Sequence, residues 1–172
     1  VYGATPAGCA AATAAGRLGM RVAVFEPLPM IGGMGAAGNL ALHDGATRTP
    51  LTGLALDFAM YNARAYNVSH PVAQPESFVA NASLHAMLHD AGVERVELDC
   101  RLTGATPTIA SAASSSSSSV ASIDVRCQPG KPVTAAVFVD ASYDGEIMVS
   151  VGNVDFTYGR ESSATYNESL AG

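Results

Sequence analysis

The sequence predicts an α/β fold, in which helices pack on a parallel sheet and a small antiparallel β-meander follows. Three observations support this fold class. The chain opens with a glycine-rich turn and a helix of small residues between two short apolar segments. Two further helical periodicities follow, each beyond a stretch rich in Gly or Pro. Later, alternating apolar and polar residues flank a serine-rich run, as expected of paired strands.

The first unit reads as strand, turn, helix and strand. Val1 and Tyr2 would end the first strand, and the turn Gly3–Gly8 follows. A helix rich in Ala, the best helix former, continues to about Leu18. Arg21–Glu26 is rich in valine and predicts a buried strand. Because a buried strand is usually longer than two residues, we expect the chain to be incomplete at its start.

The turn and helix have the features of a dinucleotide phosphate site. Gly3 permits a tight turn, and the helix start directs free N–H groups and a positive dipole end toward it. Gly8 removes a side chain where helix and strand pack, and Glu26 can accept both ribose hydroxyls of an adenosine. Thr5 replaces the second glycine of G-x-G-x-x-G, giving a GxGxxG-like motif. With Pro6 it makes a favourable helix start, so its hydroxyl should cap the helix or contact phosphate.

A second glycine segment favours a flavin over a nicotinamide nucleotide. Gly32–Gly33 and then Gly38 follow the second strand, where the chain would turn beneath a ribityl-pyrophosphate. The first turn alone would also fit a sheet–helix connection with incidental glycines. The spacing of both segments together predicts a dinucleotide site.

These residues resemble the N-terminus of FAD-dependent oxidoreductases of the glutathione-reductase-like superfamily, which carries two dinucleotide-binding motifs. The resemblance lies in Val1–Gly8, Glu26–Pro27 and Ile31–Met34, and later in Asp140–Glu146 and the tail Gly159–Gly172. Many such proteins carry Ser or Thr at the second glycine position. The resemblance implies a Rossmann-like FAD-binding parallel sheet, FAD as cofactor, and flavin-mediated hydride or electron transfer on an unidentified small-molecule substrate.

The resemblance also implies that this chain is an N-terminal fragment, inactive by itself. Family members continue for several hundred residues with a substrate domain, so the domain is expected to be incomplete at both ends. No side chain is assigned to catalysis and no metal is expected. Leu102 would meet the adenine through its backbone. The expected cofactor contacts are Gly3, Ala4, Thr5, Pro6, Ala7, Gly8, Glu26, Pro27, Gly32, Gly33, Met34, Leu102, Asp140, Ala141 and Gly145.

The rest of the nucleotide-binding part is predicted from periodicity. Residues 39–50 read as a loop, and Leu51–Tyr66 has the apolar spacing of an amphipathic helix. A second helix would start at Glu76 or Ser77 and end before Gly92. Val93–Leu102 would then be the third parallel strand.

Residues 1–172 are expected to form one partial FAD/NAD(P)-binding domain in three parts. Residues 1–102 would be the βαβ nucleotide-binding part, and 103–137 a β-meander with a disordered Ser-rich insertion at 111–122. Residues 138–172 would return to the nucleotide-binding sheet and stop within the domain. Ala136–Val139 reads as a buried strand that leads into the Asp140 turn.

Several other residues have alternative interpretations. His43 and Asp44 would either assist catalysis beside a flavin ring or form a solvated loop pair. His85 and His89, four residues apart, would bind a metal or lie on an ordinary helix surface. The acids of Asp140–Glu146 could hold magnesium, although no phosphate-transfer motif accompanies them. The three cysteines, Cys9, Cys100 and Cys127, are expected to be small buried thiols.

Composition limits the function further. The net charge is −6 and Lys131 is the single lysine, which argues against nucleic-acid and membrane surfaces. We expect a soluble, intracellular protein, although no targeting segment identifies a compartment. Two other functions stay open from the sequence. One is a non-redox dinucleotide-binding protein similar to thiazole-synthesis proteins; the other is a degenerate fragment that binds nothing.

Overall fold

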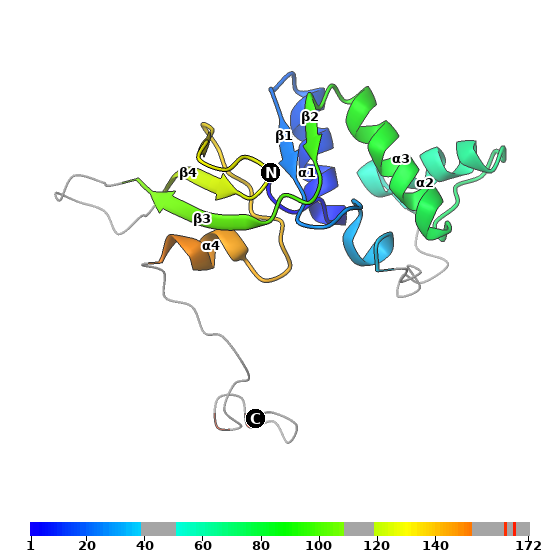
Figure 1. Cartoon of the computed structure of the whole chain (residues 1–172). Helices are drawn as coiled ribbons and strands as arrows, with labels where there is room; N and C mark the ends of the chain where they lie inside the picture. The colour runs from blue at the N-terminus through cyan, green and yellow to red at the C-terminus, as the bar shows by residue number, and fades with distance from the viewer. Residues whose placement is uncertain (39–50, 109–118, 153–163, 165–166, 168–172) are drawn as a thin grey trace.

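The computed structural model describes residues 1–38, 51–108, 119–152, 164 and 167, and shows a mixed α/β fold with two separate sheets. One sheet is parallel and lies against α1, with α3 and α2 beyond it (Figure 1). The other is an antiparallel meander on the opposite side of the chain's start, with α4 packed along it (Figure 1). The fold class predicted from the sequence is therefore confirmed in its mixed α/β content and its two kinds of sheet. The division at residues 102 and 137 stays a prediction.

The parallel sheet is built around the first residues of the chain. β1 (Ala23–Phe25) pairs in parallel with β2 (Arg95–Glu97), with Val24 opposite Val96. Tyr2 makes parallel bridges to Phe25 on one side and to Asp140 on the other. The order across the sheet is therefore β2, β1, Tyr2 and Asp140, which brings the chain's beginning beside a residue far along the sequence.

The helices follow the predicted ranges closely. α1 spans Pro6–Arg17, α2 Gly53–Ala65 and α3 Ser77–Asp90, and a single 3₁₀ turn, η1, spans Gly33–Gly35. α1 and α2 are joined by an ion pair in which the Arg17 guanidinium lies 2.6 Å from the Asp57 carboxylate. Among the described residues, no helix is both long enough and apolar enough to cross a membrane.

The predicted antiparallel meander is confirmed, and its strands run from Leu102 to Thr134. β3 (Leu102–Pro107), β4 (Val120–Val125) and β5 (Val133–Thr134) pair in antiparallel order, and α4 (Glu146–Val151) packs on β3. The disordered insertion predicted at residues 111–122 ends too late in the sequence, because residues 120–122 belong to β4. Pairing with β3 supplies the backbone partners that the serine-rich composition did not indicate. Residues 111–118 lie outside the described part.

The prediction of a buried strand at Ala136–Val139 is wrong. Val137 is 74% exposed, and regular pairing is limited to the single bridge between Asp140 and Tyr2. Among the described residues, the segment that runs parallel to residues 136–140 is Val1–Gly3. Two backbone hydrogen bonds join them, from the Tyr2 amide to the Val139 carbonyl and from the Ala141 amide to the Tyr2 carbonyl. An apolar β-branched run has strand propensity, but burial requires neighbours on both faces.

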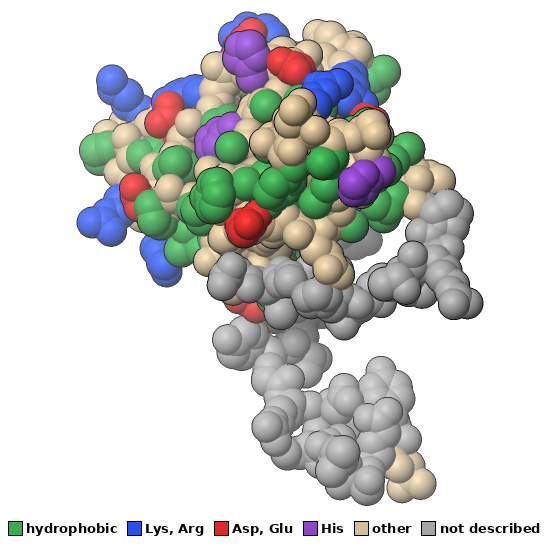
Figure 2. All heavy atoms as spheres, turned by 90° about the vertical axis from the view of Figure 1, so that its right-hand side faces the viewer, with side chains coloured by type: hydrophobic (Ala, Val, Ile, Leu, Met, Phe, Trp, Pro, Cys, Tyr) green, Lys and Arg blue, Asp and Glu red, His purple; other side chains and the backbone are tan. Residues whose placement is uncertain are grey.

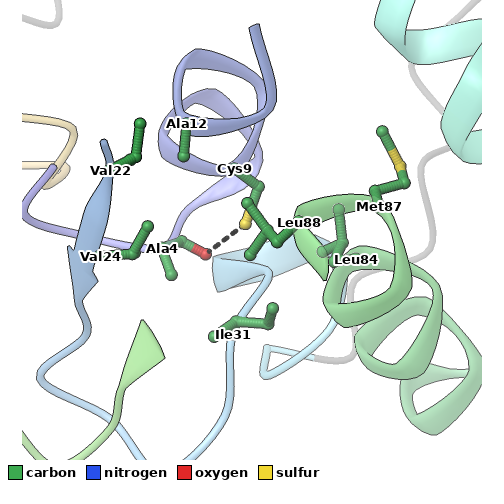
Figure 3. Packing of buried hydrophobic residues seen from close by; sticks show 9 residues of the cluster. All are labelled: Ala4, Cys9, Ala12, Val22, Val24, Ile31, Leu84, Met87 and Leu88. Atoms are coloured by element: carbon green, nitrogen blue, oxygen red, sulfur yellow. Dashed lines mark hydrogen bonds between the residues drawn. The ribbon is translucent and has the colours of Figure 1, made fainter. Parts of the chain in front are cut away.

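Buried apolar side chains form two clusters. The first lies between α1, the parallel sheet and α3, and includes Cys9, Val24, Ile31 and Leu88 (Figure 3). The second lies beneath the meander and α4, around Tyr2, Phe25, Ile123 and Ile147. The turn after Tyr2 passes between these clusters, so packing on both sides holds it in place.

The cysteine prediction holds for one residue of three. Cys9 is a buried free thiol, and burial raises its pKa to about 12, with the charge of Glu26 as a second cause. Cys100 and Cys127 instead form a disulfide with a Cα–Cα distance of 4.9 Å. Their separation of 27 residues gave no motif, and the pair forms because Cys100 follows β2 while Cys127 follows β4.

Candidate functional site

Three separate stretches of the chain meet at the start of α1. The Gly32 amide donates to the Ala4 carbonyl at 2.7 Å, which joins the two glycine segments. The Thr5 hydroxyl donates to the Ala141 carbonyl at 2.9 Å, which joins the first turn to the stretch after Asp140. The Met34 amide donates to the Tyr143 hydroxyl at 2.8 Å and closes the triangle. The structure thus brings together most of the residues predicted to contact a cofactor.

The carboxylate of Glu26 is held in a fixed place beside this turn. Its Oε2 accepts from the Ala4 amide at 2.6 Å and its Oε1 accepts from the Leu28 amide at 2.9 Å. Burial raises the pKa of Glu26, the Leu28 and Ala4 N–H bonds oppose that rise, and the charge of Glu146 adds to it. Among the described residues each carboxylate oxygen has one hydrogen-bond partner, which leaves a second lone pair on each for a donor such as a ribose hydroxyl.

The Thr5 hydroxyl caps α1. Thr5 has extended backbone angles (φ −63°, ψ 171°), and its Oγ1 accepts from the Gly8 amide at 3.2 Å. Its single proton is donated to Ala141, so it has no second proton to donate to a phosphate. Of the two roles predicted for Thr5, capping is the one in the structure.

Thr5→Val should therefore destabilise the protein and Thr5→Ser should not. Valine keeps the shape but loses both the cap and the bond to Ala141, which together contribute about 2 kcal/mol to the free energy of unfolding. Urea denaturation of the three proteins measures this. Equal stability of the Val and Ser variants would contradict the capping role.

The glycines of the turn are required by close backbone contacts. Gly3 has φ of +87°, and a Cβ there would lie 2.8 Å from the Ala141 carbonyl carbon and the Ser142 amide nitrogen. A Cβ on Gly8 would overlap the Gly3 carbonyl oxygen. The first turn of α1 thus packs directly on the strand end, which is the close helix–strand packing that these glycines permit in a nucleotide-binding turn.

The start of α1 fits an anionic group. Ala7 lies in the first helical turn, is exposed, and its amide has no acceptor among the described residues. No acidic residue occupies that first turn, so the positive end of the helix dipole is not neutralised by a side chain. Free N–H groups at a helix start are the usual donors to phosphate oxygens.

The remaining predicted contacts differ in what they can offer. The Asp140 carboxylate accepts from Ser142 in its own turn and from Ile147 and Met148 in α4, and these bonds fill its acceptor sites. The Leu102 amide donates to the Tyr2 hydroxyl at 2.9 Å. The Asp140 carboxylate and the Leu102 amide are thus already occupied. A cofactor contact at either residue stays a prediction, and it would have to involve another backbone atom of that residue. Pro27 is half-buried and Gly145 precedes α4 with φ of +67°.

Two tyrosines that the sequence analysis did not single out hold the site together. Tyr143 is 58% exposed, and its hydroxyl lies against Gly33 as well as the Met34 amide. Tyr2 is buried, and its hydroxyl donates to Glu146 Oε2 at 2.7 Å while accepting from Leu102. Burial raises the pKa of Tyr2, so it stays protonated and keeps both bonds. Nothing in the local sequence around either tyrosine predicts these long-range hydrogen bonds.

An apolar pocket of about 200 Å³ lies next to the second glycine segment. It is lined by side chains of α1, α2 and α3 and by the turn of η1, namely Pro6, Ala10, Gly32, Gly35, Leu54, Ala55, Phe58, Leu84 and Met87. Figure 2 shows hydrophobic side chains gathered across this side of the molecule, with charged side chains of both signs around them. Its walls offer almost no polar group, so it does not suit a pyrophosphate or a ribose.

Of the histidines considered as candidates, His85 and His89 lie in the described part of the chain and His43 does not. Within the described ranges, His85 and His89 on α3 do not join a third ligating side chain, and His89 Nδ1 pairs with the Asp90 carboxylate at 3.2 Å. His85 is half-buried and His89 is exposed on the surface of α3, and neither interpretation of the pair is tested further by the described residues. His43 and Asp44 lie outside the described residues.

Comparison with known proteins agrees with this arrangement. A family model described as FAD dependent oxidoreductase matches residues 1–171. No curated protein matches the chain. The cofactor that this description names, FAD, is a dinucleotide with a pyrophosphate and a ribose, the groups for which the turn and Glu26 have free donors and acceptors. The chain belongs to the FAD-dependent oxidoreductase family.

Proposed function

We propose that this chain is the Rossmann-like, FAD-binding portion of an oxidoreductase and that it binds the ADP half of the cofactor. The observation that carries the proposal is the meeting of both glycine segments at the start of α1, beside a carboxylate with two unused acceptor sites. Bound FAD supplies hydride or electron transfer to a substrate that these residues do not identify.

Different residues of the chain would bind different parts of the cofactor. The Ala7 amide and the dipole of α1 would bind the pyrophosphate in front of Gly3–Gly8. Glu26 would accept the two hydroxyls of the adenosine ribose and so orient the adenosine. Gly33 and Met34 would border the ribityl side, where the Tyr143 hydroxyl now accepts from the Met34 amide.

A binding experiment with parts of the cofactor tests this proposal. FAD and ADP should both bind the chain, and ADP should compete with FAD, whereas FMN, which lacks the adenosine, should bind far more weakly. Isothermal titration of each compound measures this. If neither FAD nor ADP binds, the proposal fails; if FMN binds as tightly as FAD, the assignment of the ADP half fails.

A charge placed on Ala7 tests the pyrophosphate position. Ala7→Glu puts a carboxylate at the exposed helix start, where it repels phosphate but interacts favourably with the helix dipole. We expect unchanged or slightly higher stability and at least about tenfold weaker FAD binding. The control is Ala14→Glu, which places the same charge at an exposed position further along α1. Equal FAD binding by the two variants would contradict the pyrophosphate assignment.

A further inference from the structure

The disulfide between Cys100 and Cys127 lies outside the glycine turns and has no part in the function proposed above. Cys100 is fully buried and comes shortly after β2, whereas Cys127 is exposed in the turn after β4. The Cys127 residue is therefore open to solvent, whereas Cys100 is not. Such a pair can be opened from one side by an external thiol.

A third metal-ligating side chain stands beside the pair. The ligand atoms of Glu97, Cys100 and Cys127 all lie within 4.8 Å of one another. Two thiolates and a carboxylate are a donor set that suits Zn²⁺, which is bound tetrahedrally at about 2.3 Å from sulfur and about 2.1 Å from oxygen. These bond lengths require the two sulfurs to stand about 3.8 Å apart, a distance that side-chain rotation can produce once the S–S bond is broken.

Glu97 is already oriented for such a role. Its Oε1 accepts from Arg95 Nε at 2.5 Å, and its Oε2 has no partner among the described residues. Arg95 is held in turn over the ring of Phe25, 5.6 Å from its centroid. Metal-binding carboxylates commonly have an outer partner of this kind, which fixes the direction of the free oxygen.

We propose that Glu97, Cys100 and Cys127 form a redox-controlled site for a thiophilic divalent cation such as Zn²⁺. In the oxidised protein the two sulfurs are joined and no metal binds. In the reduced protein two thiolates and the Glu97 carboxylate bind the metal, and water completes the tetrahedron.

The exchange balances with a dithiol as the reductant. One thiolate of the dithiol attacks the sulfur of the exposed residue Cys127, the S–S bond breaks, and Cys100 leaves as a thiolate. The second thiol of the dithiol then displaces Cys127 and closes the reductant's own disulfide, so two electrons pass to the protein. Binding of Zn²⁺ by the two thiols releases two protons.

The proposed site lies next to the strand that carries Glu26. The Cys100 amide donates to the Glu26 carbonyl at 2.8 Å, and the Glu26 amide donates to the Glu97 carbonyl at 2.8 Å. Two of the proposed metal ligands, Glu97 and Cys100, thus lie on the segment that is hydrogen-bonded to the backbone of Glu26. The test below contains no flavin, so its result does not depend on the proposed function.

Cobalt binding by the reduced chain tests the proposal. The protein is reduced with a dithiol, freed of reductant under nitrogen and titrated with Co²⁺ and then Zn²⁺. We expect one Co²⁺ per chain, a thiolate-to-cobalt charge-transfer band in the near ultraviolet that Zn²⁺ abolishes, and protection of two thiols from a thiol-labelling reagent. The oxidised protein should show neither the band nor the binding.

Matched variants identify the ligands. Cys127→Ser should lose the band, and Glu97→Gln, which keeps the disulfide, should bind Zn²⁺ at least about tenfold more weakly. Cys9→Ala and Glu94→Gln alter a thiol and an exposed carboxylate outside the site and should bind as the unaltered chain does. Absence of the band in the reduced chain, or unchanged affinity in Glu97→Gln, would overturn the three-residue site.

Discussion

Gly3→Ala is expected to abolish FAD binding and to lower the free energy of unfolding by about 3 kcal/mol or more. A left-handed backbone costs an L-residue about 1–2 kcal/mol. The added Cβ would also lie 2.8 Å from backbone atoms of Ala141 and Ser142, which cannot rotate away as a side-chain end would. Relief requires moving the stretch that the Thr5 hydroxyl holds against the turn.

Gly19→Ala is the matched control for this prediction. Gly19 has a similar φ of +77°, but a Cβ there meets no atom within 4 Å. Gly19→Ala should therefore cost only the backbone strain, about 1–2 kcal/mol, and leave FAD binding unchanged. Chemical denaturation without FAD gives both stabilities, and titration with FAD gives both affinities. Equal losses in the two variants would show that close packing at Gly3 contributes nothing beyond strain.

The local elements of this fold could be predicted because their signals lie within a few residues. Thr5 followed by Pro6 marks the start of α1, and Val22 and Val24 mark the buried strand at β1. The glycine positions could be predicted for the same reason, because a positive φ or the lack of a Cβ is a property of a single residue. The part of the candidate site that could be predicted from the sequence is therefore its two glycine segments and the start of α1.

The contacts that join distant segments could not be predicted in this way. The disulfide between Cys100 and Cys127 depends on β2 and β4 ending near each other, which no spacing in the sequence encodes. Tyr143 on Met34 and Tyr2 on Glu146 likewise depend on how α4 and its preceding turn pack. Ala136–Val139 shows the reverse case: this segment has strand propensity, but none of the described elements covers it on both faces.

The carboxylate of Glu26 should give stability and FAD affinity opposite dependences on pH. Burial raises the pKa of Glu26 in the folded protein above its ordinary value of 4.5. Between these two values the folded state holds a proton that the unfolded state has lost, so the free energy of unfolding falls as pH rises. Only the ionised carboxylate can accept both ribose hydroxyls while holding Ala4 and Leu28, so FAD affinity should rise over the same range.

Glu26→Gln separates these effects from other titrating groups. The amide has one acceptor oxygen instead of two, so it cannot hold both backbone amides and both hydroxyls, and FAD binding should weaken about tenfold or more. The variant should also lose the part of both pH dependences that lies just above pH 4.5, because its side chain does not titrate. Glu94→Gln, an exposed change, should keep both. Denaturation and FAD titration from pH 4 to pH 8 measure them. If stability and FAD affinity change in the same direction with pH, the carboxylate that binds ribose is not Glu26.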